Sequence, residues 1–214
     1  SFTDYQLYEK DETFYFECGR NLFEAYNIGT SGSKTYKLTL PGQSLGKEQL
    51  TVVFTAAASS PTVVSTTVNG NALSNFSVAE LGSYQYGNSA SKTFDVSKYK
   101  TGSDWTVRLA STTGHDSHLD YLAMSYDRLI TPGSTFVAFT SNNKGNTTFE
   151  ISGFSNDCKL MRIGQPGVET VLIDAKPDGG VCQVGVDNGS YRYVCFNANA
   201  TYPEPSVIGD VANQ

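Results

Sequence analysis

The sequence lacks the features of a membrane protein and of a nucleic-acid-binding protein. It contains no run of about 18 apolar residues, the length that a membrane-spanning helix needs. It begins SFTDYQLYEK, without a basic and apolar signal pattern, so any export signal lies upstream, and we expect the chain itself to be soluble. Its 15 Lys and Arg residues form no cluster, and the net charge of -6 repels phosphate backbones. We expect neither a membrane-spanning segment nor a nucleic-acid partner.

The sequence also lacks the motifs of common catalytic and cofactor sites. It has no GxSxG nucleophile elbow, no phosphate-binding loop and no CxxC pair of a zinc ribbon. Its histidines, His115 and His118, lie with Asp116 and Asp120 in the segment GHDSHLD, and these side-chain types ligate zinc or copper. Residues three apart on a strand face opposite sides, so the histidines converge only if the segment bends. We therefore expect no catalytic residue, no cofactor and no metal.

Cysteine is scarce, and its spacing leaves the redox state open. The four cysteines, Cys18, Cys158, Cys182 and Cys195, allow three pairings into two disulfides, or none. Cys182 and Cys195 would face each other across a hairpin that turns at residues 187–189, so this pair is the most plausible bridge. The alternative is a set of four buried, reduced thiols.

The residues that are abundant predict an all-β protein. The chain has 20 Gly, 13 Tyr and 12 Phe but only 17% charged residues, a composition typical of short strands joined by small-residue turns. Apolar side chains recur at every second position in many segments, and no helical period extends over ten residues. A tight hairpin turn is expected at Asn69-Gly70. We expect strands within residues 13–17, 34–40, 50–58, 63–68, 92–112 (two strands), 118–130, 135–140, 147–154, 158–164, 169–175, 180–186 and 191–198.

The order of these segments predicts two domains. Residues 1–132 carry the pattern of a jelly-roll, galactose-binding-like β-sandwich. After Pro132-Gly133 the strands become shorter, so residues 133–214 are expected to form a smaller second β-domain. The tail from Tyr202 to Gln214 contains two prolines, which exclude it from an inner strand, and we expect it to exit toward a further domain.

Residues 118–130, HLDYLAMSYDRLI, are expected to form a central strand of the first domain. Apolar residues occur at both odd and even positions, which predicts that both faces of the strand are covered. Asp120 is unusual on such a strand, and a carboxylate there should be held by backbone N–H and Tyr O–H donors. We assign structural roles to Asp120, Tyr121 and Arg128.

Aromatic residues are the remaining candidates for ligand binding. Tyr84, Tyr86, Tyr99 and Trp105 fall in or next to predicted loops of the first domain, and exposed flat rings stack on the faces of sugars. The alternative for each is that the ring fills or covers the core.

Three segments carry a resemblance to a known family. YQLYEKDETFYFECGR near the start, LDYLAMSYDR in the middle and GDVANQ at the end resemble the N-terminal, non-catalytic region of gingipain-type cysteine peptidases, in particular the sortases of type IX secretion. The resemblance runs over the whole chain. It implies an exported protein, periplasmic or at the cell surface, in which a caspase-like peptidase domain follows and holds the catalytic Cys and His. No residue of this chain inherits a catalytic role.

Two functions are compatible with these observations. The first is an accessory module that packs on and supports the downstream peptidase domain and helps to position exported protein substrates. The second is a carbohydrate-binding module of a secreted or surface protein, because galactose-binding sandwiches also end on a strand that resembles LDYL. A tail contact through Val207 and Ile208 with the following domain is expected for the first.

Overall fold

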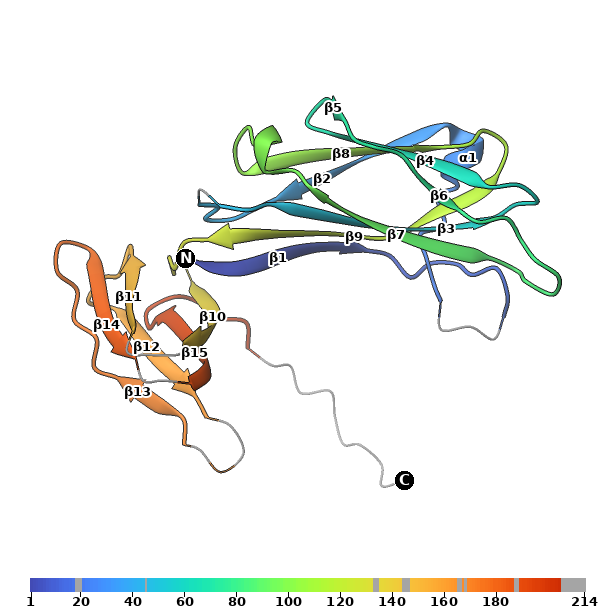
Figure 1. Cartoon of the computed structure of the whole chain (residues 1–214). Coiled ribbons are helices and arrows are strands. Elements are labelled where there is room, and N and C mark those ends of the chain that lie inside the picture. The colour runs from blue at the N-terminus through green and yellow to red at the C-terminus, as the bar shows by residue number, and fades with distance from the viewer. Residues whose placement is uncertain are drawn as a thin grey trace, which may run out of the picture. The chain divides into compact units, whose positions relative to one another are not determined.

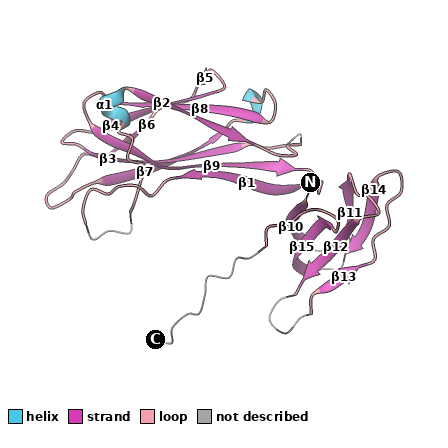
Figure 2. Ribbon diagram, turned by 180° about the vertical axis from the view of Figure 1, so that it is seen from behind, coloured by secondary structure: helices cyan, strands magenta, loops and turns pink. Residues whose placement is uncertain are grey.

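A computed structural model of the chain describes residues 1–17, 21–44, 46–132, 135–143, 147–164, 167, 169–186 and 189–204. Strands make up almost all of the regular structure, as Figure 2 shows in magenta. The prediction of an all-β chain is confirmed. The chain divides into two compact units, one of residues 1 and 3–128 and one of residues 2 and 129–214. No helix in the described ranges is long and apolar enough to cross a membrane.

The first unit is a sandwich of two sheets (Figure 1). One sheet contains, in spatial order, β1 (Phe2–Glu9), β9 (Asp116–Arg128), β3 (Gln49–Ala57) and β7 (Asn88–Asp95). The other contains β2 (Ser33–Thr39), β8 (Asp104–Ser111), β4 (Thr62–Val68) and β5 (Asn71–Ala72), with β6 (Phe76–Val78) also paired to β4. The chain crosses repeatedly from one sheet to the other, which is the jelly-roll arrangement that the sequence predicted. Two short helices, α1 (Ile28–Ser31) and η1 (Ser97–Tyr99), lie in connections.

Alternation of apolar and polar residues produces the core between these sheets. β4, for example, buries Thr62, Val64, Thr66 and Val68 and exposes the residues between them to differing degrees. The hairpin turn predicted at Asn69-Gly70 is confirmed, because β4 pairs with β5 and both turn residues have positive φ, 46° and 81°. The largest fully buried side chains of this core are Trp105, Tyr126, Phe54, Ile28, Leu40, Leu50, Leu109, Leu119, Leu122 and Met124.

The start of the chain differs from the prediction. β1 was not anticipated, although its burial alternates along its whole length. Residues 13–17 were expected to form a strand, but in the described part of this segment only Thr13 pairs, in an isolated bridge with Phe23. The aromatic residues of this segment are used to cover a sheet rather than to extend one.

β9 is an inner strand, as predicted, because it lies between β1 and β3. Its burial differs from the prediction, because Val53 pairs with Tyr121 whereas the next residue, Phe54, pairs with Leu119. This bulge leaves Asp120 without a partner on β3 and reverses the alternation. Leu119 therefore faces the core together with the even-numbered apolar residues that follow. The other face, which includes Tyr121, is only half-buried, so the expectation that both faces are covered is met in part.

The second unit also consists of strands. One sheet has the order β10 (Phe136–Asn143), β15 (Gly189–Asn197), β12 (Cys158–Ile163) and β13 (Val171–Ile173), and β11 (Thr147–Ser152) pairs separately with β14 (Val181–Val186). Four of these strands, β11 to β14, fall within segments that the sequence predicted, whereas β10 and β15 overlap the predicted segments 135–140 and 191–198 and extend beyond them. Their buried side chains form a second core, which includes Ile130, Val137, Phe139, Ile151, Phe154, Leu160, Val184 and Tyr193.

The predicted hairpin between Cys182 and Cys195 is wrong. β14 pairs with β11, whereas β15 pairs with β10 and β12, so these cysteines do not lie opposite each other on paired strands. Cys158, Cys182 and Cys195 are free, buried thiols, in agreement with the reduced alternative. Burial raises the pKa of Cys182, and burial together with the two other thiols raises the pKa of Cys195 to about 12. Cys18 and residues 205–214 of the predicted exit tail lie outside the described residues.

A buried carboxylate ties three parts of the first unit together. Glu24, 1% exposed, accepts hydrogen bonds from Tyr8 Oη at 2.6 Å, Lys34 Nζ at 2.5 Å and Tyr36 Oη at 2.8 Å. Its backbone N–H donates to the carbonyl of Leu119 on β9. Burial alone would raise the pKa of Glu24, but the hydrogen bonds from Lys34, Tyr8 and Tyr36 outweigh it and hold that pKa below its usual value.

The substitution Glu24→Gln is expected to destabilise the first unit by about 1–3 kcal/mol at neutral pH, because charge-assisted hydrogen bonds are lost in a buried place. A carboxyl group with a lowered folded-state pKa stabilises above its unfolded pKa, and this contribution disappears as the pH falls through the folded pKa. Urea denaturation at a series of pH values therefore should show a difference that shrinks in acid. Glu80→Gln, at an exposed position, is the control and should change little. A pH-independent difference would contradict this account.

Candidate functional site

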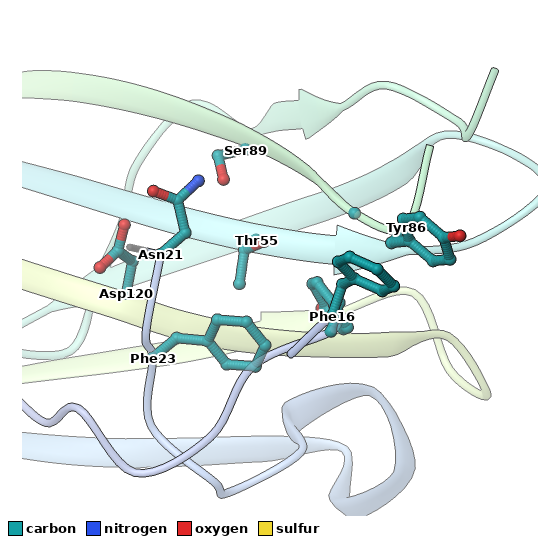
Figure 3. A pocket seen from close by; sticks show the side chains of 9 residues that line it. Phe16, Asn21, Phe23, Thr55, Tyr86, Ser89 and Asp120 are labelled. Atoms are coloured by element: carbon teal, nitrogen blue, oxygen red, sulfur yellow. The ribbon is translucent and has the colours of Figure 1, made fainter. Parts of the chain in front are cut away.

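A pocket of about 230 Å³ opens on the first unit, and we call it the aromatic pocket (Figure 3). Thr55 of β3, Ser89 of β7 and Asp120 of β9 contribute to it from three neighbouring strands. The rest comes from the segment after β1 and from the residues just before β7. The described residues that line it are Tyr15, Phe16, Asn21, Phe23, Thr55, Tyr86, Gly87, Ser89 and Asp120.

The covering segment, residues 10–17 and 21–27, is fixed to the sheet by several contacts. Thr13 and Phe23 exchange backbone hydrogen bonds of 3.0 Å, which brings the two arms of the segment together. The Phe23 ring is 3% exposed and lies 4.5 Å from the Tyr15 ring and 4.9 Å from the His118 ring, centroid to centroid. Tyr15 Oη donates to the carbonyl of Asp116 at 3.3 Å. The aromatic wall of the pocket is therefore anchored on β9.

Gly87 allows the sheet edge to approach this wall closely. A Cβ atom at this position would lie 2.1 Å from Cδ2 of Tyr15, a distance at which atoms overlap. The absence of a side chain at residue 87 thus lets the Tyr15 ring lie against the backbone. Any larger residue would displace that ring and alter the pocket.

The two histidines do not converge. His118 is buried beneath the covering segment, with Nδ1 2.9 Å from the carbonyl oxygen of Glu24 and Nε2 2.8 Å from Oδ1 of Asp116. His115 instead has Nδ1 2.8 Å from Oγ1 of Thr62. Across the described part of the chain, no group of three or more His, Cys, Asp or Glu side chains is arranged to hold a metal ion.

Asp120 lies in the pocket because of the bulge in β9. Its carboxylate was expected to be held by hydrogen bonds, but no donor to it occurs among the described residues, so this expectation is wrong for that part of the chain. Burial raises the pKa of Asp120, and the carboxylates of Glu9 and Asp11 raise it further. The pocket therefore holds a half-buried acid whose charge is uncompensated by any of these neighbours.

Of the predicted ligand-facing aromatics, Tyr86 lines the pocket. Its ring is 57% exposed and stacks on that of Phe16, which is 47% exposed, with centroids 4.3 Å apart and an angle of 17° between the planes. Tyr84 is fully exposed and has a positive φ of 65°, but it is not among the lining residues. One face of each stacked ring is used in the pair, which leaves the other faces and edges for a ligand.

The other predicted aromatics have different surroundings. Trp105 is 0% exposed in the first core, with Nε1 3.4 Å from Oε1 of Gln43, so the prediction that it faces a ligand is wrong. Its place on the inward face of β8 follows from the period-two pattern that it shares with Val107 and Leu109. Tyr99, in η1, is partly buried against the same core.

Two residues predicted to be structural lie on β9 away from the pocket lining. Arg128 forms an ion pair with Asp4 of β1, with Nη1 and Oδ2 2.7 Å apart. Tyr121 is half-buried and lies opposite Val53 on β3. Sequence reasoning missed most of the described lining residues, namely Tyr15, Phe16, Asn21, Phe23, Thr55, Gly87 and Ser89. For those before residue 25, the signal was the density of aromatic and acidic residues in that segment.

Comparison with solved structures gives a substantial likeness. No protein-family model and no curated protein matches the chain. The solved structure of dimeric latent PorU from Porphyromonas gingivalis is similar to 100% of this chain at a TM-score of 0.75 and 17% sequence identity. The chain spans 22% of the length of that PorU chain. At this identity the likeness establishes a common fold, which extends over both units.

Glycoside hydrolases give weaker likenesses. A β-glucuronidase from Ruminococcus gnavus is 10% identical at a TM-score of 0.34, covering 90% of this chain and 43% of its own. A β-glucuronidase from Bacteroides uniformis is 11% identical at a TM-score of 0.34, covering 90% of this chain and 28% of its own. At TM-scores this low no shared fold follows.

The substitution Asp120→Asn is expected to raise the melting temperature at neutral pH, contrary to what a hydrogen-bonded carboxylate would give. A carboxyl group with a raised folded-state pKa makes the protein less stable as the pH rises from the unfolded pKa through the folded one. The asparagine variant escapes this loss. The melting temperature of the variant should therefore equal that of the unaltered protein in acid. As the pH rises and Asp120, close to Glu9 and Asp11, loses its proton, the variant should become the more stable of the two, and the difference should then level off.

Thermal denaturation monitored by circular dichroism across this pH range provides the measurement. Asp127→Asn, on the same strand but outside the pocket lining, is the matched control and should not show this rise. A lower melting temperature for Asp120→Asn at neutral pH would mean that the carboxylate has stabilising partners.

Proposed function

We propose that this chain is a non-catalytic accessory module of an exported gingipain-like cysteine peptidase of the type IX sortase kind. In this proposal it packs on and supports a caspase-like peptidase domain that follows in the same polypeptide. The observation that carries the proposal is the likeness to PorU, which includes both units in one alignment at a TM-score of 0.75. The three segments that resemble the N-terminal region of the gingipain-type peptidases support it from the sequence.

The chemistry of the described cysteines supports a role without catalysis. A nucleophilic cysteine needs a lowered pKa and access to substrate. Cys158, Cys182 and Cys195 are buried, and burial raises the pKa of the last two. The histidines lie in the first unit. His118 forms hydrogen bonds with the Glu24 carbonyl and the Asp116 carboxylate, and His115 forms one with the Thr62 hydroxyl.

The proposal also includes a location and partners. An exported module would work in the periplasm or at the cell surface, and its partners would be the downstream peptidase domain and exported protein substrates. Carbohydrate binding is the second candidate, and the exposed pair of Phe16 and Tyr86 is the observation in its favour. The burial of Trp105 counts against a broad aromatic platform for sugars.

We further propose that the two units are separate domains. Each has its own hydrophobic core, and Ile130 packs in the second, so we place the boundary near residue 129 rather than at residue 132. Residues 1–128 and residues 129–214, produced separately, should each give the dispersed amide NMR spectrum of a folded protein. A piece with a collapsed, unfolded spectrum would show that the units depend on each other.

The accessory role predicts where peptidase activity resides. Residues 1–214 alone should not cleave peptides after Arg or Lys. The continuation of the gene should encode a caspase-like domain with a catalytic Cys and His. The full-length protein should cleave such peptides. Replacing Cys158, Cys182 or Cys195 by Ser in the full-length protein should leave its catalytic Cys intact. Any loss of peptidase activity in these variants should follow from lower stability. Cleavage by residues 1–214 that one such replacement abolishes would refute the proposal, as would a gene without a peptidase domain.

A further inference from the structure

We propose that the aromatic pocket binds an organic cation on an apolar stem, such as the guanidinium or ammonium end of an arginine or lysine side chain. The Asp120 carboxylate would pair with the cationic group, and the rings of Phe16, Phe23 and Tyr86 would contact the stem. This site is a property of the first unit, so it does not depend on a downstream peptidase domain.

Charge is the first reason for a cationic ligand. The Asp120 carboxylate has no hydrogen-bond donor and no ion-pair partner in the described ranges, and none of the described residues that line the pocket is Lys or Arg. The charged groups that act on it most, Glu9 and Asp11, are both acidic. A neutral ligand would leave this negative potential unchanged, whereas a cation would compensate it.

Unused hydrogen-bonding capacity is the second reason. Thr55 Oγ1 already donates to the carbonyl of Asn88 at 3.0 Å. The side chains of Asn21 and Ser89, in contrast, have no hydrogen-bond partner within the described part of the chain. Figure 3 shows both of them on the same side of the pocket as Asp120. The Asn21 and Ser89 oxygens can accept N–H groups, as can the carboxylate, which suits a donor-rich guanidinium or ammonium.

The aromatic side of the pocket supplies the third reason. The stacked pair of Phe16 and Tyr86 lies at the opposite side from Asp120, and Phe23 lies beneath the space between them (Figure 3). Aromatic rings contact the methylene groups of a long side chain and attract its cationic end through their negative faces. A ligand with a charged end and an apolar stem matches this polarity.

Size decides between a side chain and a larger ligand. The cavity of about 230 Å³ is smaller than the roughly 300–1,000 Å³ of pockets that enclose drug-sized ligands. At about 30 Å³ for each water in the liquid, it still exceeds the volume of several waters. One extended side chain or one end of a polyamine therefore fits better than an oligosaccharide.

The test is an NMR titration of the 214-residue chain with N-acetyl-arginine amide and with N-acetyl-citrulline amide. Citrulline has nearly the same shape as arginine but no charge, so the pair isolates the cation without altering the protein. We expect the arginine compound to shift the amide signals of the covering segment, of Tyr86 to Ser89 and of Asp120. Equal binding of the two compounds, or shifts confined to other residues, would overturn the proposal.

Protein variants then test the carboxylate. Asp120→Asn should weaken binding by roughly tenfold or more, because one charged hydrogen-bonding partner is lost. Asp127→Asn, on the same strand, should bind as the unaltered protein does. If Asp120→Asn proves unfolded, Tyr86→Ala supplies a second variant, which should weaken binding by removing one half of the stacked pair. Unchanged affinity in a folded Asp120→Asn variant would rule out the proposed pairing.

Further probes distinguish the sources of the cation. Spermidine represents a polyamine and N-acetyl-arginine amide represents a polypeptide side chain, and Asp120-dependent binding of either supports the cation site. The stronger of the two identifies the source. Methyl glucoside represents a neutral sugar, and binding of this compound in place of both cations would overturn the proposal in favour of carbohydrate recognition. None of these outcomes bears on whether a peptidase domain follows, so the two proposals can fail separately.

Discussion

The bulge in β9 is the constraint on which the first unit depends. β9 pairs with strands on both sides, so a uniform alternation would place either Leu119 or the group of Leu122, Met124 and Tyr126 on the face away from the core. The extra residue between Tyr121 and Leu119 brings all of them to the buried face, where each is 0% exposed. As a consequence one residue, Asp120, has no partner on β3, and that residue carries a carboxylate.

The covering segment and the bulge in β9 together form the aromatic pocket. Its rings close over the outer face of the sheet near Asp120, so the carboxylate loses water without gaining a donor from the described residues. Glu24, which lies in the same covering segment, has the opposite surroundings, because its carboxylate accepts hydrogen bonds from Tyr8, Lys34 and Tyr36. Glu24, with three donors, is therefore best explained as a structural residue. Asp120, with no donor among the described residues, is better explained as a binding residue.

Sequence patterns anticipated the elements better than their partners. Period-two alternation located most strands, because burial of one face is a local property of the chain. The segment of β9 was located instead by its apolar residues at both odd and even positions. Alternation misplaced the Cys182 and Cys195 pair, because neighbouring strands that belong to two different sheets have the same local pattern as a hairpin. It also could not reveal Asp120 as a pocket residue, since the register shift arises from the pairing of β9 with β3 and leaves no signature in either strand alone.

The comparison with PorU shows a similar fold built from mostly different side chains. An identity of 17% at a TM-score of 0.75 shows that the arrangement of buried faces is similar, while most individual side chains differ. Cores tolerate such replacement as long as volume and patterning are kept, whereas a binding site depends on particular groups in a particular geometry. The likeness therefore shows a common fold and does not bear on a common ligand. Among the described residues that line the aromatic pocket, Asp120 is the one whose place packing alone does not explain, because its carboxylate has no cationic partner there.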